Sequence, residues 1–231
     1  MRLKQMAQIH HQKLTENLHQ QYSVDEYTAM LVEQEWEERQ NSKIKRLINS
    51  ANFKATAAVS DLDFKTQRGL NRDTINKICL LNFIKKKQNV ILTGPAGVGK
   101  SYIAQAIGHQ ACIEGYKAYY QNTSRFIAML KFAKIEGTYL KELKRLSRIN
   151  LIVLDDFGLN KFDQKEREIL MDLIEDRHET CSTIIASQIP ITKWHAIIGE
   201  GTIADAILDR LINSAYRIAL KGKSLRKNTI N

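Results

Sequence analysis

The sequence has no run of about 20 apolar residues, which is the length needed to cross a bilayer. Its first residues, MRLKQMAQIHHQKL, contain no apolar core of the signal-peptide type. The three cysteines, Cys79, Cys112 and Cys181, are widely spaced and form no metal-binding pattern. We therefore expect a cytoplasmic protein without membrane contacts, whose cysteines stay reduced and behave as small buried side chains.

Glycine and proline are absent from the first 50 residues. Apolar side chains recur there every four residues, at Leu14, Leu18 and Tyr22, as in a helix. Ser23 followed by Glu26 has the pattern of a capping box, which predicts a second helix reaching Trp36. A less regular linker follows at about 50–63. We therefore expect a small helical N-terminal domain over residues 1–63.

The positive charge is unevenly distributed. The whole chain has a net charge of +10, yet residues 1–63 carry eight basic and nine acidic side chains. The excess therefore lies within residues 64–231. An excess of this size suits a polyanion, of which nucleic acid is the commonest, although a surplus of solvated lysines would give the same count.

From residue 64 onward, short apolar runs alternate with helical patterns. Buried, β-branched strands between helices predict an α/β fold with a parallel sheet covered on both faces. The ligands of such sheets bind at the carboxyl ends of the strands. The five expected strands are Asn89–Thr93, Ala118–Gln121, Asn150–Leu154, Thr183–Ser187 and Ala215–Leu220.

A phosphate-binding loop follows the first expected strand. The string GPAGVGKS fits the pattern G-x-x-x-x-G-K-[ST] between a strand and a helix. Its glycines let backbone N–H groups surround phosphates, Lys100 reaches the β- and γ-phosphates, and the Ser101 hydroxyl coordinates Mg²⁺. The predicted ATP contacts are Gly94, Pro95, Ala96, Gly97, Val98, Gly99, Lys100, Ser101 and Tyr102.

A pair of carboxylates ends the third expected strand. Four apolar residues, Leu151–Leu154, precede Asp155 and Asp156, which is the Walker B arrangement. Asp155 is predicted to hold Mg²⁺ and Asp156 to polarise the attacking water. A solvated turn after a strand would give the same pattern without a phosphate-binding loop upstream.

Two local strings mimic other nucleotide enzymes. Asp155–Gly158 reads DxxG and Asn160–Asp163 reads NKxD, the guanine signature of GTPases. A single residue separates the two strings, so they could not span both γ-phosphate and base. The DFG string at Asp156–Gly158 lacks an HRD-like catalytic loop, so a protein kinase is also excluded.

Polar residues further along the chain could complete the site. The fourth expected strand delivers Ser187 and Gln188, and we expect Gln188 first and Ser187 second to touch the γ-phosphate or the water. Arg210 ends a helical pattern and could stabilise transition-state charge in a neighbouring subunit. Arg226 lies in a basic tail that could return to the nucleotide. A polar strand end, a surface ion pair and an ordinary tail remain the alternatives.

Together these residues resemble the AAA+ ATPases, and specifically the IstB/DnaC-like group. The likeness covers nearly the whole chain and includes GPAGVGKS, LIVLDDFG, ADAILDRL and GKSLRK. The run from Ser187 to Trp194 followed by ADAILDRL points to IstB, the helper of insertion-sequence transposition. Asp156 departs from the glutamate of many relatives, and Gln188 from their asparagine.

This resemblance implies a bacterial AAA+ ATPase domain over residues 64–231. It implies catalytic roles for Lys100, Asp156 and Gln188 or Ser187, an arginine finger at Arg210 and a sensor arginine at Arg226. It also implies an ATP-dependent homo-oligomer on double-stranded DNA with little sequence preference. The further partner would be an IstA-like transposase or, alternatively, a replicative helicase.

A basic stretch between the second and third expected strands is the candidate DNA contact. Four of its cations are spaced by three and four residues, which places them on one helical face. Initiator-type AAA+ proteins also touch DNA in this region, whereas a solvated helix face would look the same. The predicted contacts are Lys131, Lys134, Lys141, Lys144, Arg145 and Arg148.

Four functions therefore compete. The leading hypothesis is an ATPase that assembles on target DNA and assists a transposase. A helicase loader shares the same motifs. A small-molecule kinase would need an acceptor site and an arginine-rich lid, and neither can be placed in the sequence. A non-hydrolysing DNA scaffold is the fourth, because Asp156 is shorter than the usual glutamate.

Overall fold

The computed structural model describes residues 3–199 and 201–225. The chain divides into two compact units, Met1–Arg46 and Leu47–Asn231. The boundary expected after residue 63 lies inside the second unit. The reason is that Ala51 and Leu62, in the expected linker, are buried in that unit's core.

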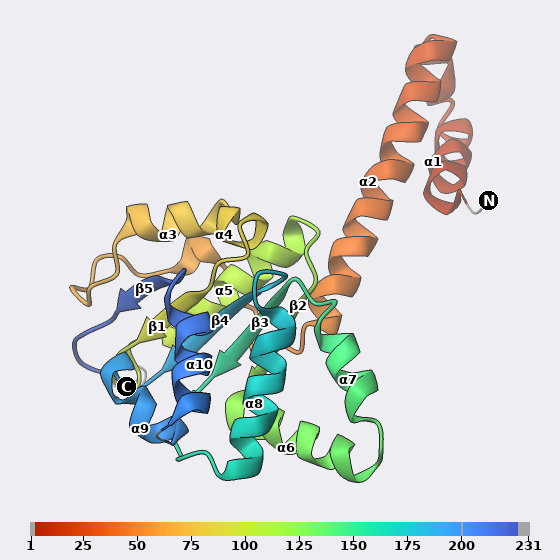
Figure 1. Cartoon of the computed structure of the whole chain (residues 1–231). Coiled ribbons are helices and arrows are strands. Elements are labelled where there is room, and N and C mark those ends of the chain that lie inside the picture. The colour runs from red at the N-terminus through yellow and green to blue at the C-terminus, as the bar shows by residue number, and fades with distance from the viewer. Residues whose placement is uncertain (1–2, 200, 226–231) are drawn as a thin grey trace. The chain divides into compact units, whose positions relative to one another are not determined.

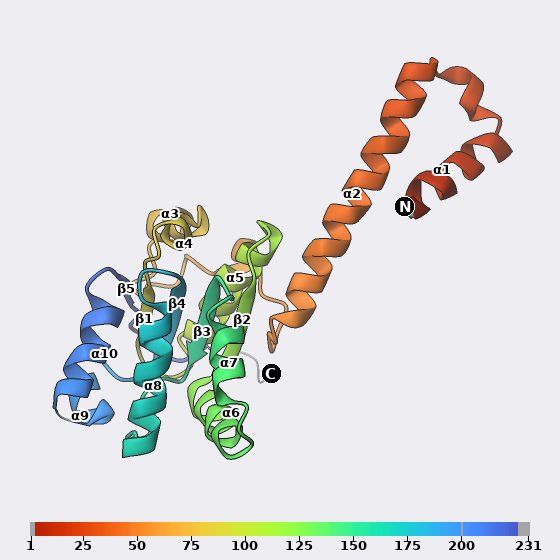
Figure 2. The same cartoon turned by 45° about the vertical axis from the view of Figure 1, so that its right-hand side comes forward.

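The first unit is helical. It contains α1 (Lys4–Thr15) and η1 (Leu18–Gln21), followed by α2 (Val24–Ser50), whose first part belongs to it. Figure 2 shows the chain reversing direction between α1 and α2. The expected capping box forms, because the Ser23 backbone N donates to Glu26 Oε2 over 2.9 Å and the Glu26 backbone N donates to Ser23 Oγ over 3.3 Å.

A carboxylate of α2 caps the start of α1. Glu35 Oε2 accepts hydrogen bonds from the backbone N of Gln5 at 3.0 Å and of Met6 at 3.1 Å. Those bonds hold the pKa of Glu35 below its ordinary value. Within α1 and α2 only Leu31 and Glu35 are buried. This unit therefore has almost no apolar core of its own.

Five parallel strands form the sheet of the second unit, as expected. Their order is β2-β3-β4-β1-β5, so β4 lies between the strands that carry the phosphate-binding loop and the paired carboxylates. Each strand agrees with its expected range to within one residue at either end. The strands are β1 (Val90–Thr93), β2 (Ala118–Asn122), β3 (Leu151–Asp155), β4 (Ser182–Ser187) and β5 (Tyr216–Ala219).

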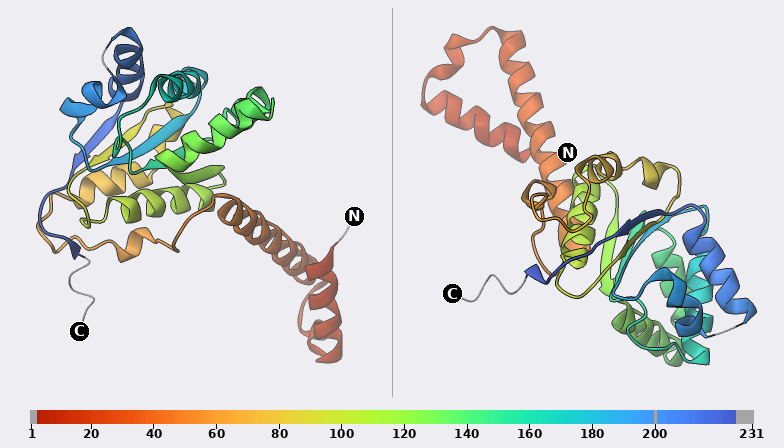
Figure 3. Two further views of the ribbon diagram at one scale, coloured as in Figure 1. Left: turned by 90° about the horizontal axis from the view of Figure 1, so that it is seen from below. Right: turned by 90° about the vertical axis from the view of Figure 1, so that its left-hand side faces the viewer.

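Helices cover both faces of this sheet (Figures 1 and 3). Alternate strand residues enter two separate cores, so Leu92 packs on one face and Ile91 on the other. On the Leu92 face lie α3 (Arg72–Cys79), α4 (Asn82–Lys85) and α5 (Lys100–Ile113). On the Ile91 face lie α6 (Thr123–Ile135), α7 (Tyr139–Leu146), α8 (Gln164–Arg177), α9 (Trp194–Ile198) and α10 (Thr202–Ile212). The turns η2 (Val59–Asp61) and η3 (Ile191–Lys193) complete the elements.

Two sequence-based expectations concern membranes and thiols. No helix in the described part of the chain is long and apolar enough to cross a bilayer. Cys79, Cys112 and Cys181 are free, as expected, although only Cys112 is fully buried. Burial raises the pKa of the Cys112 thiol to about 11.

Candidate functional site

The phosphate-binding loop joins β1 to α5 and depends on its glycines. Gly94 has φ +148°, and a Cβ on it would collide with the backbone carbonyl of Leu220. Lys100, the first residue of α5, donates from Nζ to the carbonyl oxygens of Gly94 and Pro95, each over 2.7 Å. The ammonium group is therefore held inside the curve of the loop, beside the N-terminus of α5.

Two oxygen atoms from different elements form a candidate Mg²⁺ site. Ser101 Oγ on α5 donates to Asp155 Oδ1 at the end of β3, over 3.0 Å. The other oxygen, Asp155 Oδ2, accepts from the hydroxyl of Tyr120 over 2.5 Å. Burial raises the pKa of Tyr120 most, and the hydrogen bond to Asp155 raises it further, so the phenol remains a donor. A hydroxyl and a carboxylate facing one cavity are the hard oxygen donors that suit Mg²⁺.

Two side-chain amides hold the second carboxylate. Asn122 Nδ2 donates to Asp156 Oδ2 over 3.1 Å, and Gln188 Nε2 donates to Asp156 Oδ1 over 3.4 Å. Asp156 itself has φ +55°, a conformation that aspartate tolerates better than most residues. Asp156 is therefore fixed from both neighbouring strands, β2 and β4.

These residues meet around one cavity of about 590 Å³. The cavity lies at the carboxyl ends of the strands, where the fold places its ligands. Most residues predicted to bind or hydrolyse ATP line it. They are Ala96, Gly97, Gly99, Lys100, Ser101, Tyr102, Asp155, Asp156 and Gln188.

The remaining predicted residues have other surroundings. Ser187 is fully buried, and its hydroxyl donates to the carbonyl of Phe157 over 2.7 Å. Gln188, and not Ser187, therefore lines the cavity. Val98 is also buried, and its backbone oxygen accepts a hydrogen bond from Arg68.

Arg210 lies at the opposite end of the sheet from the phosphate-binding loop. Asn89, which directly precedes β1, donates from Nδ2 to the carbonyls of Arg210 and Leu211, each over 3.2 Å. The loop, in contrast, follows β1. Arg226 lies outside the described residues, but the chain before it reaches the loop, because the Leu225 backbone N donates to the Gly97 carbonyl over 2.9 Å.

Four further residues at the site were not expected from the sequence. Besides Tyr120 and Asn122, Lys54 lines the cavity and places Nζ 5.6 Å from the centre of the Tyr120 ring. Arg68 is buried and donates from Nη1 to the Val98 carbonyl over 2.6 Å. Lys54 and Arg68 come from residues 51–71, whose irregular pattern gave no signal in the sequence.

Four of the six predicted DNA contacts gather around a second cavity, of about 660 Å³. We call this second cavity the basic cavity. Arg145 faces it while its Nε lies 2.8 Å from Glu142 Oε2 and its guanidinium 5.3 Å from the centre of the Tyr119 ring. The cations that line it are Lys117, Lys141, Lys144, Arg145 and Arg148.

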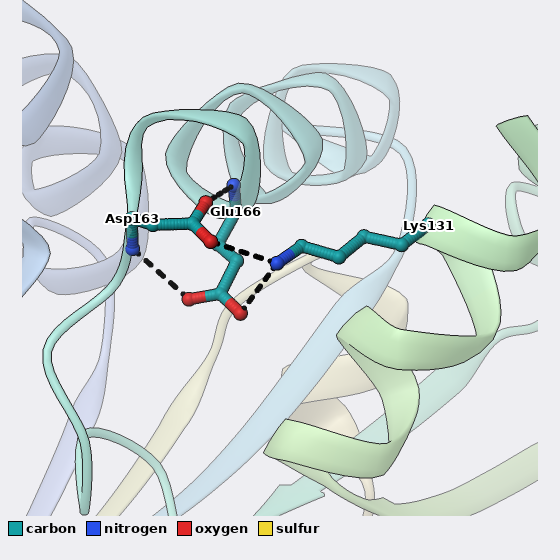
Figure 4. A network of polar contacts seen from close by, with 3 residues as sticks. All are labelled: Lys131, Asp163 and Glu166. Atoms are coloured by element: carbon teal, nitrogen blue, oxygen red, sulfur yellow. Dashed lines mark hydrogen bonds and ion pairs between the residues drawn. The ribbon is translucent and has the colours of Figure 1, made fainter.

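Lys131 and Lys134 are separate from that group. Lys131 Nζ lies 2.8 Å from Asp163 Oδ2 and 2.9 Å from Glu166 Oε1 (Figure 4). Asp163 caps α8, and Glu166 Oε2 accepts a hydrogen bond from the Asp163 backbone N. Lys134 Nζ lies 4.5 Å from the centre of the Tyr139 ring. Lys131 therefore fastens α6 to α8, and we leave it out of the proposed DNA surface.

Sequence comparisons identify relatives over the whole length. The model of the family described as IstB-like ATP binding protein matches residues 1–231. An insertion sequence ATP-binding protein of Sinorhizobium fredii is 38% identical over 228 residues, covering 99% of this chain and 93% of that protein. The insertion sequence IS21 ATP-binding protein of Pseudomonas aeruginosa is 31% identical over 201 residues, covering 87% and 76%.

Solved structures confirm the fold. The DnaC helicase loader superposes with a TM-score of 0.63 at 22% identity, covering 77% of this chain and 99% of that one. The replication initiator DnaA, bound to AMPPCP and single-stranded DNA, gives 0.63 at 16% identity, covering 74% and 52%. With its five parallel strands, phosphate-binding loop and full-length family match, the chain belongs to the IstB-like ATP-binding proteins, which have the AAA+ P-loop fold.

Proposed function

We propose that this protein is an Mg²⁺-dependent ATPase that assembles on duplex DNA in its ATP-bound state and assists a transposase. The observation that carries the proposal is the separation of Arg210 from the phosphate-binding loop. Arg210 lies beside the start of β1, and the loop follows its end. Among the described residues lining the ATP cavity, the cations are Lys54 and Lys100, without an arginine. A neighbouring copy can supply one.

The side chains around the cavity have distinct roles in hydrolysis. Lys100 binds the β- and γ-phosphates, while Ser101 and Asp155 hold Mg²⁺, which neutralises triphosphate charge. Asp156 accepts a proton from the attacking water, and Gln188, hydrogen-bonded to Asp156, orients that water. Arg210 of the next copy stabilises the charge that develops on the transferred phosphoryl group.

This arrangement makes ATP a switch for assembly. The γ-phosphate lies between Lys100 of one copy and Arg210 of the next, so it contributes to the interface between them. Hydrolysis and phosphate release remove that contact and weaken the assembly. A contact between two different surfaces repeats along the assembly and produces a ring or a helical filament.

The basic cavity is the proposed DNA contact. Its five cations face a single carboxylate, that of Glu142. Lysine and arginine side chains bind backbone phosphates without reading the sequence, and such binding weakens steeply with salt. Lys134, one helix away on α6, can extend this surface.

The helical unit is the proposed contact for the transposase. Its apolar side chains Tyr22, Val32 and Trp36 are exposed, Trp36 by 61%. Large exposed apolar side chains are typical of protein-binding surfaces. The likeness of the chain to the DnaC helicase loader supports a helicase loader as the second candidate, with a ring helicase as its partner. The names of the relatives favour the transposase.

Electron microscopy of the protein with duplex DNA and a non-hydrolysable ATP analogue tests the proposal. We expect closed rings or filaments around the duplex, with Arg210 of one copy against the nucleotide of the next. A protein that stays monomeric with saturating Mg-ATP and plasmid DNA would contradict it.

Phosphate release measured with and without DNA separates an ATPase from a scaffold, and water as the only acceptor excludes a kinase. Pull-down experiments with the transposase and with the replicative helicase show which of these two candidate partners binds the protein.

A further inference from the structure

A third cavity, of about 540 Å³, lies at the end of the sheet where the strands begin. We call it the amino-end cavity. Its walls are the turn between α4 and β1 and the last turns of α8 and α10. Four cations line it, against the two carboxylates of Glu179 and Asp209. The cations are Lys86, Lys87, Arg177 and Arg210. The cavity is therefore suited to an anion.

Two residues that line this cavity each have a buried side-chain atom without a hydrogen-bond partner. The two atoms are Arg210 Nε, a donor, and Gln88 Oε1, an acceptor. In the part of the chain that the structure describes, only one other buried side-chain nitrogen or oxygen is unpartnered, Arg68 Nε. Buried polar groups in folded proteins are nearly always paired, so these two point to a partner outside this chain.

The guanidinium of Arg210 is held in place by its own protomer. Glu175 Oε2, on α8, lies 2.7 Å from Arg210 Nη2, and Arg210 Nη1 donates to the Ala206 carbonyl over 3.1 Å. Asn89 fixes the backbone beneath it, because its side chain joins the Arg210 carbonyl to the Thr183 backbone N at the start of β4. Arg210 therefore meets an incoming group with its position already set.

Arg177, in contrast, is not free to bind a ligand. It is almost completely buried and donates to the carbonyls of Leu146 and Ile149 and, over 2.6 Å, to that of Ser182. Its role in the cavity is structural. The cations left for a ligand are Arg210 and the neighbouring pair Lys86 and Lys87, which are exposed.

We propose that the amino-end cavity is the socket for the ATP-bound edge of a second copy of this chain, with Lys86 and Lys87 acting beside Arg210 on its triphosphate. The inference rests on the proposed function and adds two residues to the interface. A triphosphate is an anion that one arginine neutralises only in part.

Oligomers mixed from two variants test this directly, because only one kind of interface in them has both an ATP and an arginine. An Arg210→Ala chain can hold ATP but offers no arginine, so it is the acceptor. A Lys100→Ala chain offers its arginine but holds no ATP, so it is the donor. Adding Lys86→Ala and Lys87→Ala to the donor should lower ATP hydrolysis of the mixture about tenfold, the worth of one charged hydrogen bond. Adding the same two changes to the acceptor should leave hydrolysis unchanged.

Lys85→Ala in the donor is the matched control, because Lys85 carries the same charge in the same stretch but does not line the cavity. It should leave hydrolysis of the mixture unchanged. Equal loss with the Lys85 variant, no loss from the lysine pair, or loss only in the acceptor would each overturn the inference. Loss of DNA retention with ATP hydrolysis intact would assign the lysines to the duplex and overturn it as well.

The proposed function fails in a different way. If the donor and acceptor chains, without lysine changes, hydrolyse no more ATP together than apart, Arg210 does not act between copies. If they do restore hydrolysis and the lysine pair has no effect, only the socket is wrong.

Discussion

Asn122 joins the carboxylate of Asp156 to the start of α6. Its Nδ2 donates to Asp156 Oδ2 over 3.1 Å, while its Oδ1 accepts from the backbone N of Ser124 over 3.1 Å. A single side chain thus contacts the carboxylate proposed to activate water and caps the helix that leads to the basic cavity. A displacement of α6 by bound DNA would be felt at Asp156 through this residue.

Replacing Asp156 with asparagine should separate ATP binding from hydrolysis. Asparagine adopts the same positive φ and can accept from Asn122, but it cannot take a proton. We expect unchanged ATP affinity and phosphate release lowered about a hundredfold. DNA-bound oligomers should therefore accumulate in ATP, as seen by gel filtration. Rapid turnover in this variant would mean that another group activates the water.

Replacing Lys100 with alanine should abolish nucleotide binding and, with it, assembly on DNA. The ammonium group proposed to contact the phosphates, which the carbonyls of Gly94 and Pro95 hold at the loop, is lost, whereas the loop glycines remain. Binding of a fluorescent ATP analogue and analytical ultracentrifugation with DNA measure the two effects. A circular-dichroism melt is the control for folding. ATP-dependent oligomers that persist in this variant would contradict the assigned role of Lys100.

Arg210 should act on the ATP of a neighbouring copy. Arg210→Ala and Lys100→Ala proteins should each be inactive, and mixing them should restore part of the hydrolysis because each supplies what the other lacks. Arg210→Lys should restore less than native Arg210 in the same mixture, since lysine keeps the charge but not the planar fork. Without restoration on mixing, Arg210 has no role between copies.

Reversing two charges in the basic cavity should weaken DNA binding selectively. In Lys144→Glu/Arg145→Glu protein we expect lower DNA affinity and a shallower salt dependence, because fewer phosphate contacts form. ATP affinity should stay unchanged, because the ATP cavity contains neither residue. Lys77→Glu/Lys85→Glu, on the helices of the other face, gives the same change in net charge as a control. Unchanged DNA retention in the first variant would remove this surface from the interface.

The contacts of Lys131 predict a pH dependence of stability. Hydrogen bonds from Lys131 and from the α8 backbone hold the pKa of Asp163 below 3.8, and the two carboxylates hold the pKa of Lys131 above 10.5. The contribution of Asp163 is lost as pH falls through its lowered pKa. The contribution of Lys131 is present below 10.5 and is lost as pH rises through its raised pKa.

Lys131→Met should therefore unfold at lower urea concentration than the native chain at neutral pH. The difference in urea midpoint between the two proteins should become smaller in acid, once Asp163 is protonated. Lys165→Met, an exposed lysine on the same helix as Glu166, serves as the control. A difference in urea midpoint that stays constant from neutral pH into acid would mean that Lys131 stabilises the fold by packing alone.

The sequence predicted the features that depend on neighbours along the chain. The phosphate-binding loop, the paired carboxylates and the capping box of Ser23 and Glu26 each need only a few consecutive residues. The strands were also predicted, because a buried parallel strand has to be apolar throughout. These features were enough to predict that Lys100 and Asp155 belong to the ATP site.

The features that were missed depend on distant neighbours. Lys131 was predicted as a DNA contact because it lies in the basic stretch, and its ion pairs with carboxylates 32 and 35 residues away leave no signal there. Asn122 contacts Asp156 because β2 pairs with β3, which no local pattern specifies. The choice between Ser187 and Gln188 was not missed, because Gln188 was preferred from the sequence and lines the cavity.

The position of β5 has a consequence for synthesis of the protein. β5 is the last strand among the described residues, yet it pairs with β1, which carries the phosphate-binding loop, and the Leu225 backbone N donates to Gly97 in that loop. A chain still emerging from the ribosome therefore lacks the neighbour on one side of β1. An unfinished copy also lacks the hydrogen bond from Leu225 to Gly97, so its phosphate-binding loop has fewer supporting contacts than that of a completed copy.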